Sequence, residues 1–395
     1  MSIRTEQLLG SEITVPNIVV FRERLFVPSE TFIRSQVQSM QRYNPLYVSR
    51  RPVMNAPEGV LAVSLDAQSS RLAQYKFALG GRSRVLEKLI KQEDARLVHA
   101  HFGPDGMLIV PTAERLSLPS VITLHGRDVT ITKPDLIRAR RPVAIRYALA
   151  RASTARRATR ILCVSDYLAG KAVELGMPPE KVMTHYIGVD THRFPISRAP
   201  REPRFVHVAR LVEKKGTSVL IDALHKISPR YPDAHVDIVG DGPLRESLEA
   251  MVNAHGLRKK VHFYGQQDLA SIKTLLDRAL AFVLPSRTAE NGDQEGLPIS
   301  ILEAMSAGTP VISTRHSGIP EAIPSDAYGL LAEENDVSGL AERMEALLDS
   351  PNRATEVGLA AAQRVRQEFD LVRQSEKLEQ IYDELLEKNS AAQKN

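Results

Sequence analysis

Two glutamates, Glu295 and Glu303, flank the start of an apolar segment in the second half of the chain. Pro298 suits the first position of a helix, so we predict a helix from Pro298 to about Ala307, ended by Gly308. Glu303 would lie in the second turn of this otherwise apolar helix. A buried carboxylate without partners costs roughly a few kcal/mol. A pair of ribose hydroxyls would satisfy it, and the alternative is a structural arginine.

The loop before this helix is a candidate anion site. Backbone N–H groups at the N-terminus of a helix have no partners within the helix, and they commonly bind anions. The amides of Gly296 and Leu297 would occupy this position, beside the carboxylate of Glu295. The alternative is a solvated loop in which Glu295 contacts no ligand.

A basic loop follows the apolar run that starts at Arg204. It contains Arg210, Lys215 and Gly216, which are residue types suited to two phosphates. Arginine can bind a phosphate through two N–H groups, lysine supplies a point charge, and glycine allows the backbone to approach. The alternative is a solvated basic loop without a ligand.

A third candidate is the sequence Gly240-Asp-Gly242-Pro, which lies at a predicted turn between a strand and a helix. Tight turns need glycine in any case, and the pattern is not the full dinucleotide-binding fingerprint. Taken alone, this turn is weak evidence for a nucleotide.

In the first half of the chain, histidines stand where apolar runs end. His125 follows the run Ser120–Leu124, and His101 ends the run that begins at Ala95. His99 and His101 share one face of a predicted strand, but no third metal ligand is evident. We therefore interpret His101 as part of an acceptor pocket. For His125 the alternative is a structural histidine.

The elements that position these residues are short apolar runs alternating with helical patterns. The runs begin at Val15, Ala95, Ser120 and Arg160 in the first half, and at Arg204, Ala234, Lys260, Leu280 and Thr309 in the second. Such alternation indicates parallel sheets covered on both faces. We predict an α/β fold with two doubly wound, Rossmann-like domains. Ligands bind such sheets at the carboxyl ends of the strands, so the two domains would share an interdomain cleft.

The predicted domains cover residues 1–195 and 196–370, and a C-terminal helix over residues 371–395 would cross back to the first domain. The boundary lies in the segment 191–203, which has three prolines and no apolar periodicity. The C-terminal segment is amphipathic, because four apolar residues share one side: Leu371, Leu378, Ile381 and Leu385.

Together, the motifs resemble those of the family-4 retaining glycosyltransferases. The basic loop, the Gly240-Asp-Gly242 turn and the two glutamates have the order and spacing of that family, and the likeness covers most of the chain. The resemblance implies the two-domain GT-B architecture. It also implies transfer of a sugar from a nucleotide-sugar donor, held by the second domain, to an acceptor held by the first, with retention of configuration.

Four residues would take part in catalysis if the resemblance holds. Arg210 and Lys215 would bind the donor diphosphate and stabilise the leaving group. Glu295 would contact hydroxyls of the transferred sugar, and His125 would face that sugar and its phosphate across the cleft. The chain contains no Asp-x-Asp motif, so we expect no metal and no other cofactor, with cationic side chains in the place of a metal.

The resemblance also assigns residues to the donor and to the acceptor. Glu303 would hydrogen-bond the ribose, and the remaining donor-binding residues would be Gly216, Gly240, Gly242, Gly296 and Leu297. The acceptor side would include Ser29, Glu30, His101 and Asp128. The segments around Glu30 and His101 look like a branch that builds bacterial exopolysaccharides and colanic-acid-type polymers. Many family members have a Gly-Gly pair in the first of these loops, and its lack here leaves the acceptor contacts open.

The positive charge of the chain is concentrated in its first half. The net charge is +5, and the segment Arg138–Arg160 holds eight arginines and no acidic residue. This composition predicts an interfacial helix on anionic lipid, reached by a lipid-linked saccharide or another acceptor. The alternative is a solvated basic helix. The arginines do not show the aromatic interleaving of a nucleic-acid platform, so we expect no nucleic acid.

No signal peptide or membrane span is evident, so we expect a cytoplasmic protein, peripheral to the inner face of the membrane if the basic segment binds lipid. Three rival functions are weaker. A nucleotide-sugar epimerase would not need the set formed by Arg210, Lys215 and Glu295. A non-catalytic binding subunit would lack site residues that are present here. A dinucleotide oxidoreductase would need the missing fingerprint.

Overall fold

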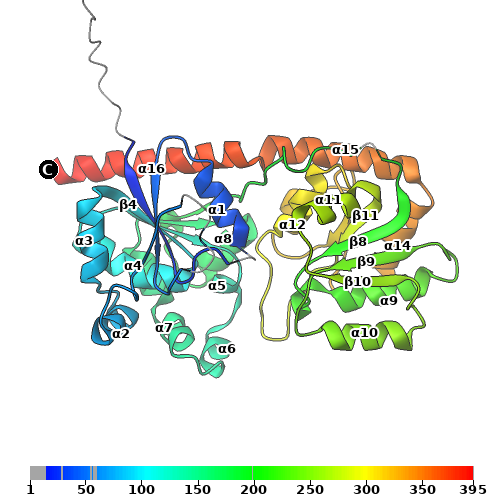
Figure 1. Cartoon of the computed structure of the whole chain (residues 1–395), viewed down its shortest axis with the longest axis horizontal. Coiled ribbons are helices and arrows are strands. Elements are labelled where there is room, and N and C mark those ends of the chain that lie inside the picture. Colours follow the sequence, from blue (N-terminus) through cyan, green and yellow to red (C-terminus); the bar gives the residue numbers. More distant parts are fainter. Residues whose placement is uncertain (1–14, 28–29, 54–55, 57–59, 198, 395) are drawn as a thin grey trace, which may run out of the picture.

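The computed structural model describes residues 15–27, 30–53, 56, 60–197 and 199–394. These residues form two α/β domains, each built on one parallel sheet (Figure 1). Ser29, which was predicted on the acceptor side, lies outside the described residues. No helix in the described part of the chain is long and apolar enough to cross a lipid bilayer.

The first domain has a seven-stranded sheet in the order β3-β2-β1-β4-β5-β6-β7. Its central strands are almost wholly buried, because helices cover both faces of the sheet. The strands are β1 (Asn17–Arg22), β2 (Asn44–Ser49), β3 (Ala62–Ser64), β4 (Ala95–His101), β5 (Ser120–Leu124), β6 (Arg160–Cys163) and β7 (Val182–Thr184). The helices are α1 (Thr31–Gln38), α2 (Arg71–Gly80), α3 (Arg84–Gln92), α4 (Gly103–Arg115), α5 (Arg127–Thr130), α6 (Lys133–Arg138), α7 (Pro142–Arg157), α8 (Asp166–Glu174) and the 3₁₀ turn η2 (Pro179–Lys181).

The second domain has a six-stranded sheet in the order β10-β9-β8-β11-β12-β13. Its strands are β8 (Glu202–Val208), β9 (His235–Val239), β10 (Val261–Gly265), β11 (Ala279–Leu284), β12 (Val311–Thr314) and β13 (Leu330–Ala332). Its helices are α9 (Thr217–Ile227), α10 (Arg245–Ala254), α11 (Leu269–Arg278), α12 (Ile299–Ser306), α13 (Ile319–Ala322), α14 (Val337–Leu348), α15 (Pro351–Glu368) and the 3₁₀ turn η3 (Glu213–Lys215).

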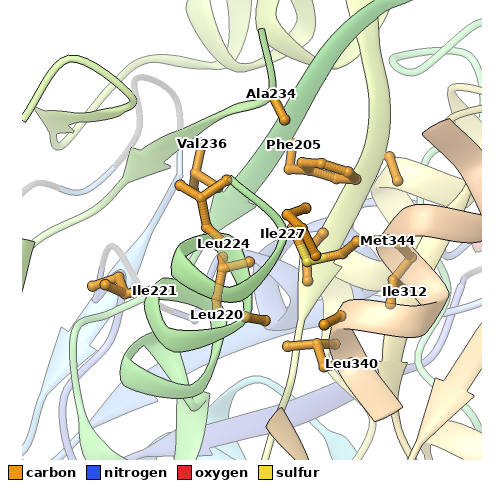
Figure 2. Packing of buried hydrophobic residues seen from close by; sticks show 14 of the residues in the cluster. Phe205, Leu220, Ile221, Leu224, Ile227, Ala234, Val236, Ile312, Leu340 and Met344 are labelled. Carbon is orange, nitrogen blue, oxygen red and sulfur yellow. The ribbon is translucent and has the colours of Figure 1, made fainter. Parts of the chain in front are cut away.

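The core of the second domain follows from helical spacing. Leu220, Leu224 and Ile227 recur at intervals of three and four residues, so they line one face of α9. Figure 2 shows this face gathered with Phe205 of β8 and Met344 of α14 in one buried cluster. The sheet is therefore sandwiched between helices, and its strand ends are left to carry the polar residues.

The last helix, α16 (Leu371–Lys394), runs back along the first domain (Figure 1). Leu378 and Tyr382 are fully buried in a core cluster of that domain. The Tyr382 hydroxyl lies 2.5 Å from His99 Nδ1 at the end of β4. The four apolar residues expected on one side of this helix are all buried, as the amphipathic pattern predicted.

Several elements differ from the expectation. The structure adds the strands β2, β3, β7 and β13, and β8 begins at Glu202, inside the segment that we predicted as a linker. The segment 138–160 is not one basic helix, because it spans the end of α6, all of α7 and the start of β6. Arg151 is buried and donates to the carbonyl of Ile131, and Arg157 pairs with Glu114. Exposed arginines gather instead at the turn between α6 and α7: Arg138, Arg140 and Arg141.

Candidate functional site

Helix α12 and the loop before it carry the two predicted glutamates. The helix begins at Ile299, with Pro298 as its N-cap, so the predicted start is one residue too early. It ends before Gly308, whose positive φ of 72° is the left-handed conformation that stops a helix.

Glu295 is buried in a cluster of lysines. Its carboxylate lies 3.1 Å from Lys215 Nζ and 3.6 Å from Lys214 Nζ. Burial by itself would raise the pKa of Glu295, but the two ammonium groups hold the pKa below its ordinary value. The side chain is therefore an ionised acceptor fixed between two cations.

Lys214 belongs to the site although the sequence reasoning passed over it. Its Nζ pairs with Asp293 at 3.1 Å and donates to the carbonyl of Gln294 at 3.2 Å. These contacts tie η3 to the loop before α12. The signal that could have found Lys214 is the Lys-Lys doublet, in which both members precede a glycine that ends a turn.

The remaining residues of the basic loop divide into one free cation and one tight turn. Arg210 is exposed directly after β8, and its side chain makes no hydrogen bond or ion pair with the described residues. Gly216 has a φ of 64°, and a Cβ atom there would lie 1.8 Å from the carbonyl oxygen of Pro285. Only glycine fits this position, so Gly216 sets the turn that presents Lys215.

Gly240 and Gly242 pack directly against the same basic loop. A Cβ atom on Gly240 would lie 1.9 Å from the carbonyl oxygen of Ala209, and one on Gly242 would lie 2.4 Å from that of Leu211. The two glycines thus let the turn after β9 support the backbone next to Arg210. This packing alone accounts for glycine at both positions.

Glu303 is partly buried, and its carboxylate forms no hydrogen bond or ion pair with any described residue. Burial raises its pKa to about 7, and the charge of Arg193 opposes this only weakly. The structural arginine that would have satisfied Glu303 is thus not in contact with it, since Arg193 pairs with Asp190 at 3.3 Å. A ligand with hydroxyl groups could donate hydrogen bonds to this carboxylate.

The backbone at the start of α12 is also open to a ligand. The amides of Gly296 and Leu297 donate to no acceptor among the described residues. The Leu297 side chain is buried in a core cluster of the second domain, so only its backbone can face a ligand. Both amides therefore remain available as anion donors.

Across the cleft, His125 follows β5 and is partly buried. Its Nε2 lies 3.2 Å from Nδ1 of His101, and its Nδ1 has no partner among the described residues. Burial holds the pKa of both histidines well below the ordinary value, so both rings are neutral. His101 is fully buried behind His125 and does not line the cavity described below.

Asp128 orders the loop that carries His125. Its carboxylate accepts the backbone N–H of His125 at 2.9 Å and that of Gly103 at 3.1 Å. Burial raises the pKa of Asp128 to about 6, although these hydrogen bonds oppose the shift. Its contacts are with the protein backbone, and it also borders the cavity.

A cavity of about 770 Å³ opens between the domains next to these residues. Glu30 lines it and accepts hydrogen bonds from Nε and Nη2 of Arg22, each at 2.8 Å, while Nη1 of Arg22 pairs with Asp105 at 2.7 Å. Glu290 and Asn291 of the second domain line its other side. The sequence reasoning missed Arg22, whose signal was a charged residue at the end of an apolar run.

The histidines do not form a metal site with their neighbours. His99 contacts the hydroxyls of Tyr382 and Thr123 at 2.5 and 2.7 Å. Within the described ranges, no group of three or more His, Cys, Asp or Glu residues is arranged to hold a metal ion. The pair His99 and His101 stacks at 4.5 Å between ring centroids, as a packed core pair.

The two halves of the site meet at glycines. A Cβ atom on Gly126 would lie 3.1 Å from the amide nitrogen of Gly296, and one on Gly296 would lie 2.4 Å from the carbonyl oxygen of His125. The loop of His125 therefore touches the loop of Glu295. The structure thus brings the loops of Lys215, Glu295 and His125 into contact where the domains meet, and Glu30 and Asp128 line the cavity beside them.

Comparison with known sequences gives matches over most of the chain. Residues 189–364 match the family described as glycosyl transferases group 1, and residues 42–193 match glycosyltransferase family 4. WcaL of Escherichia coli, whose name refers to a glycosyltransferase of colanic acid biosynthesis, is 37% identical over 69% of this chain and 66% of its own. AmsK of Erwinia amylovora, an amylovoran biosynthesis glycosyltransferase, is 36% identical over 53% of this chain and 52% of its own. The chain therefore spans about half to two thirds of these relatives.

A third relative is matched over more of its length. The GDP-mannose-dependent alpha-(1-6)-phosphatidylinositol monomannoside mannosyltransferase of Mycolicibacterium smegmatis is 31% identical over 70% of this chain and 73% of its own. Among solved structures, sucrose-phosphate synthase of Thermosynechococcus elongatus superposes with a TM-score of 0.76 at 17% identity, over 94% of this chain and 99% of its own. Anabaena HepE, in complex with UDP and glucose, gives 0.73 at 17%, over 93% and 100%. The chain belongs to family 4 of the glycosyltransferases and has the GT-B fold.

Proposed function

We propose that this protein transfers a sugar from a nucleoside-diphosphate sugar to a saccharide or lipid-linked acceptor, with retention of configuration. The observation that carries the proposal is the partly buried carboxylate of Glu303, which forms no hydrogen bond or ion pair with the described residues. It stands on the helix whose open N-terminus lies beside the Lys215–Glu295 ion pair. A ribose, a diphosphate and a sugar together supply the groups that this arrangement lacks.

The donor lies on the second domain. Glu303 accepts hydrogen bonds from the ribose, and Arg210 and Lys215 face the diphosphate together with the amides of Gly296 and Leu297. As the sugar leaves, negative charge grows on the diphosphate, and fixed cations stabilise that charge. On this basis the reaction needs no metal ion, and a chelator should leave turnover unchanged.

The acceptor enters through the 770 Å³ cavity, which both domains line. The acceptor hydroxyl oxygen forms the new bond to the anomeric carbon from the face that the diphosphate leaves. The bond to the diphosphate oxygen breaks, and that oxygen takes the hydroxyl proton. The neutral ring of His125 contacts the sugar during this step, which suits a hydrogen-bonding role better than a charged one.

The setting that we propose is the assembly of a bacterial cell-surface polysaccharide at the cytoplasmic face of the membrane. The names of WcaL and AmsK refer to colanic acid and amylovoran biosynthesis. The exposed arginines between α6 and α7 border the same cavity, because Arg138 and Arg141 line it. They would attract an anionic lipid surface and the phosphate groups of a lipid-linked acceptor.

A ligand screen followed by a product assay tests the function. UDP, GDP and ADP, with their common sugar conjugates, are screened by thermal shift, because a ligand that binds only the folded state raises apparent stability. The donor that binds is then incubated with and without acceptor saccharides, and the anomeric configuration of the product is read by NMR. Consumption only with acceptor, and a retained anomer, is the expected result. Conversion of the donor sugar without acceptor would indicate an epimerase, and binding without any conversion a non-catalytic subunit.

A further inference from the structure

One segment of the second domain, His316–Glu321, is hydrogen-bonded to the loop of Glu295. The backbone N–H of Glu295 donates to His316 Nε2 at 3.1 Å. Ser317 Oγ donates to the carbonyl of Glu295 at 2.7 Å, and the N–H of Gly318 donates to that of Gly296 at 3.1 Å. Three successive residues of the segment thus fix the backbone that carries Glu295.

The far end of the same segment reaches the first domain. Glu321 accepts the backbone N–H of Asp166 at 2.8 Å and that of Tyr167 at 3.0 Å. These are the first two residues of α8, whose leading N–H groups have no acceptor within the helix. The hydroxyl of Tyr186 also donates to Glu321, at 2.9 Å. A carboxylate of one domain therefore caps a helix of the other.

The segment is held rigidly enough to transmit this contact. Arg364 donates to the carbonyl of Glu321 at 2.7 Å and to that of Ala322 at 3.0 Å, so the backbone of α13 is anchored to α15. A Cβ atom on Gly318 would lie 2.6 Å from both the carbonyl oxygen of Gly296 and the Cβ of Ser165. The segment is therefore closely packed between the Glu295 loop and the start of α8.

We propose that Glu321 is a positioning residue that couples closure of the two domains to the placement of Glu295. Its bonds to α8 join the two domains directly, and α8 lies on the side of the first domain that faces the second (Figure 1). The segment that ends at Glu321 is the one that fixes Glu295. Closure thus sets Glu295 for the transferred sugar. The kinetic consequence rests on the proposed function, whereas the contact itself does not.

The contact is tested by amide hydrogen exchange in the full-length protein without ligand. Hydrogen bonds to a charged acceptor are strong enough for their loss to speed exchange about tenfold or more. We expect this acceleration at Asp166 and Tyr167 in Glu321→Ala, with unchanged exchange in the second-domain core. Glu333→Ala is the matched control, since that side chain is 70% exposed and, among the described residues, pairs with Arg315 alone. Equal exchange at the start of α8 in wild type and Glu321→Ala would overturn the contact.

Glu321→Gln guards against a folding failure, because it keeps the side-chain volume while only one amide oxygen remains as acceptor. We expect intermediate exchange at Asp166 and Tyr167 in this variant. With the donor found by the thermal-shift screen, Glu321→Ala should lower kcat about tenfold or more and leave the dissociation constant of the nucleoside diphosphate unchanged. An unchanged kcat despite faster exchange would overturn the positioning role. Lack of turnover in the wild type as well would count against the proposed function and leave the exchange result standing.

Discussion

The carboxylate of Glu303 lacks a hydrogen-bond partner among the described residues, and burial raises its pKa to about 7 from an ordinary 4.5. The folded state then binds more protons than the unfolded state between these two pKa values, so the free energy of unfolding falls as the pH rises through this window. Glu303→Gln removes the buried charge. We expect the variant to match the wild type below pH 4.5 and to exceed its free energy of unfolding by up to about 3 kcal/mol above pH 7, measured by urea denaturation.

The control for this pH dependence is Glu333→Gln, which alters an exposed carboxylate. It should leave the free energy of unfolding unchanged at every pH. If Glu303→Gln shifted stability by the same amount at pH 4.5 and pH 8, the carboxylate would not be titrating in the window stated. The assignment of Glu303 to ribose binding would then lose its support.

Arg210, unlike Glu303, is not expected to affect the stability of the fold. Because it is exposed and unpaired among the described residues, Arg210→Ala should change the free energy of unfolding by no more than about 0.5 kcal/mol. Turnover of the donor should fall, with Arg210→Lys between alanine and wild type, since lysine keeps the charge but not the bidentate grip. Steady-state kinetics and thermal unfolding of the three proteins check this. Full turnover in Arg210→Ala would remove Arg210 from the leaving-group site.

Residue types and their spacing predicted which residues form the site, but they did not predict how those residues contact one another. Glu295 and Lys215 could be named from sequence because Glu295 precedes a predicted helix and Lys215 lies in a basic loop that follows an apolar run. Their direct ion pair could not, because it depends on how two loops separated by about eighty residues pack. Glu321 was hidden for the same reason, since its partners Asp166 and Tyr167 lie in the other domain.

Among the elements, the turn at Gly216 is the tightest part of the donor side. An alanine there would place Cβ 1.8 Å from the carbonyl oxygen of Pro285, on a backbone that already has a positive φ. We expect Gly216→Ala to lower the free energy of unfolding by more than about 2 kcal/mol, because the left-handed conformation alone costs roughly 1–2 kcal/mol. Chemical denaturation measures this loss.

Gly170 is the matched control for that substitution. It lies exposed within α8, where a Cβ atom would meet no atom within 4 Å. Gly170→Ala should therefore raise the free energy of unfolding by about 0.5–1 kcal/mol, as expected for alanine in a helix interior. A mild effect at Gly216 would contradict the close approach between the basic loop and β11.

The strands that the sequence predicted and those that it missed differ in burial and length. Runs such as those of β4 and β11 are buried along nearly their whole length, so they read as continuous apolar stretches. Three of the missed strands, β3, β7 and β13, have three residues each and lie at sheet edges, where a short run gives no periodic signal. The fourth, β2, has six residues and lies inside the sheet, so this reason does not cover it. The architecture could be predicted because the long buried strands define it, whereas the three-residue edge strands could not.

The molecule as a whole is tied together by α16, which starts beside the second domain and packs on the first. Asp370, the residue before α16, forms a parallel β-bridge with Val189, and the hydroxyl of Tyr382 within α16 contacts His99. His99 stacks on His101, which contacts His125. The last helix therefore supports the acceptor side of the cleft through a continuous row of buried rings.

This arrangement predicts that a change in α16 acts on one domain more than the other. Leu378 is fully buried in a core cluster of the first domain, whereas the core clusters of the second domain extend no further than Phe369. Leu378→Ala should cost the first domain about 2–5 kcal/mol. Hydrogen exchange should then show reduced protection in β1 and β4 and unchanged protection in β8 and β11.

Leu359→Ala provides the comparison, because that side chain is 49% exposed on α15 and its truncation should change little in either domain. Equal loss of protection in both sheets of Leu378→Ala would mean that the domains unfold as one unit. The contacts from Tyr382 through His99 and His101 to His125 lead to a second expectation for Leu378→Ala. If α16 supports the acceptor side, Leu378→Ala should weaken transfer to the acceptor while nucleotide binding, which depends on the second domain, stays as in the wild type.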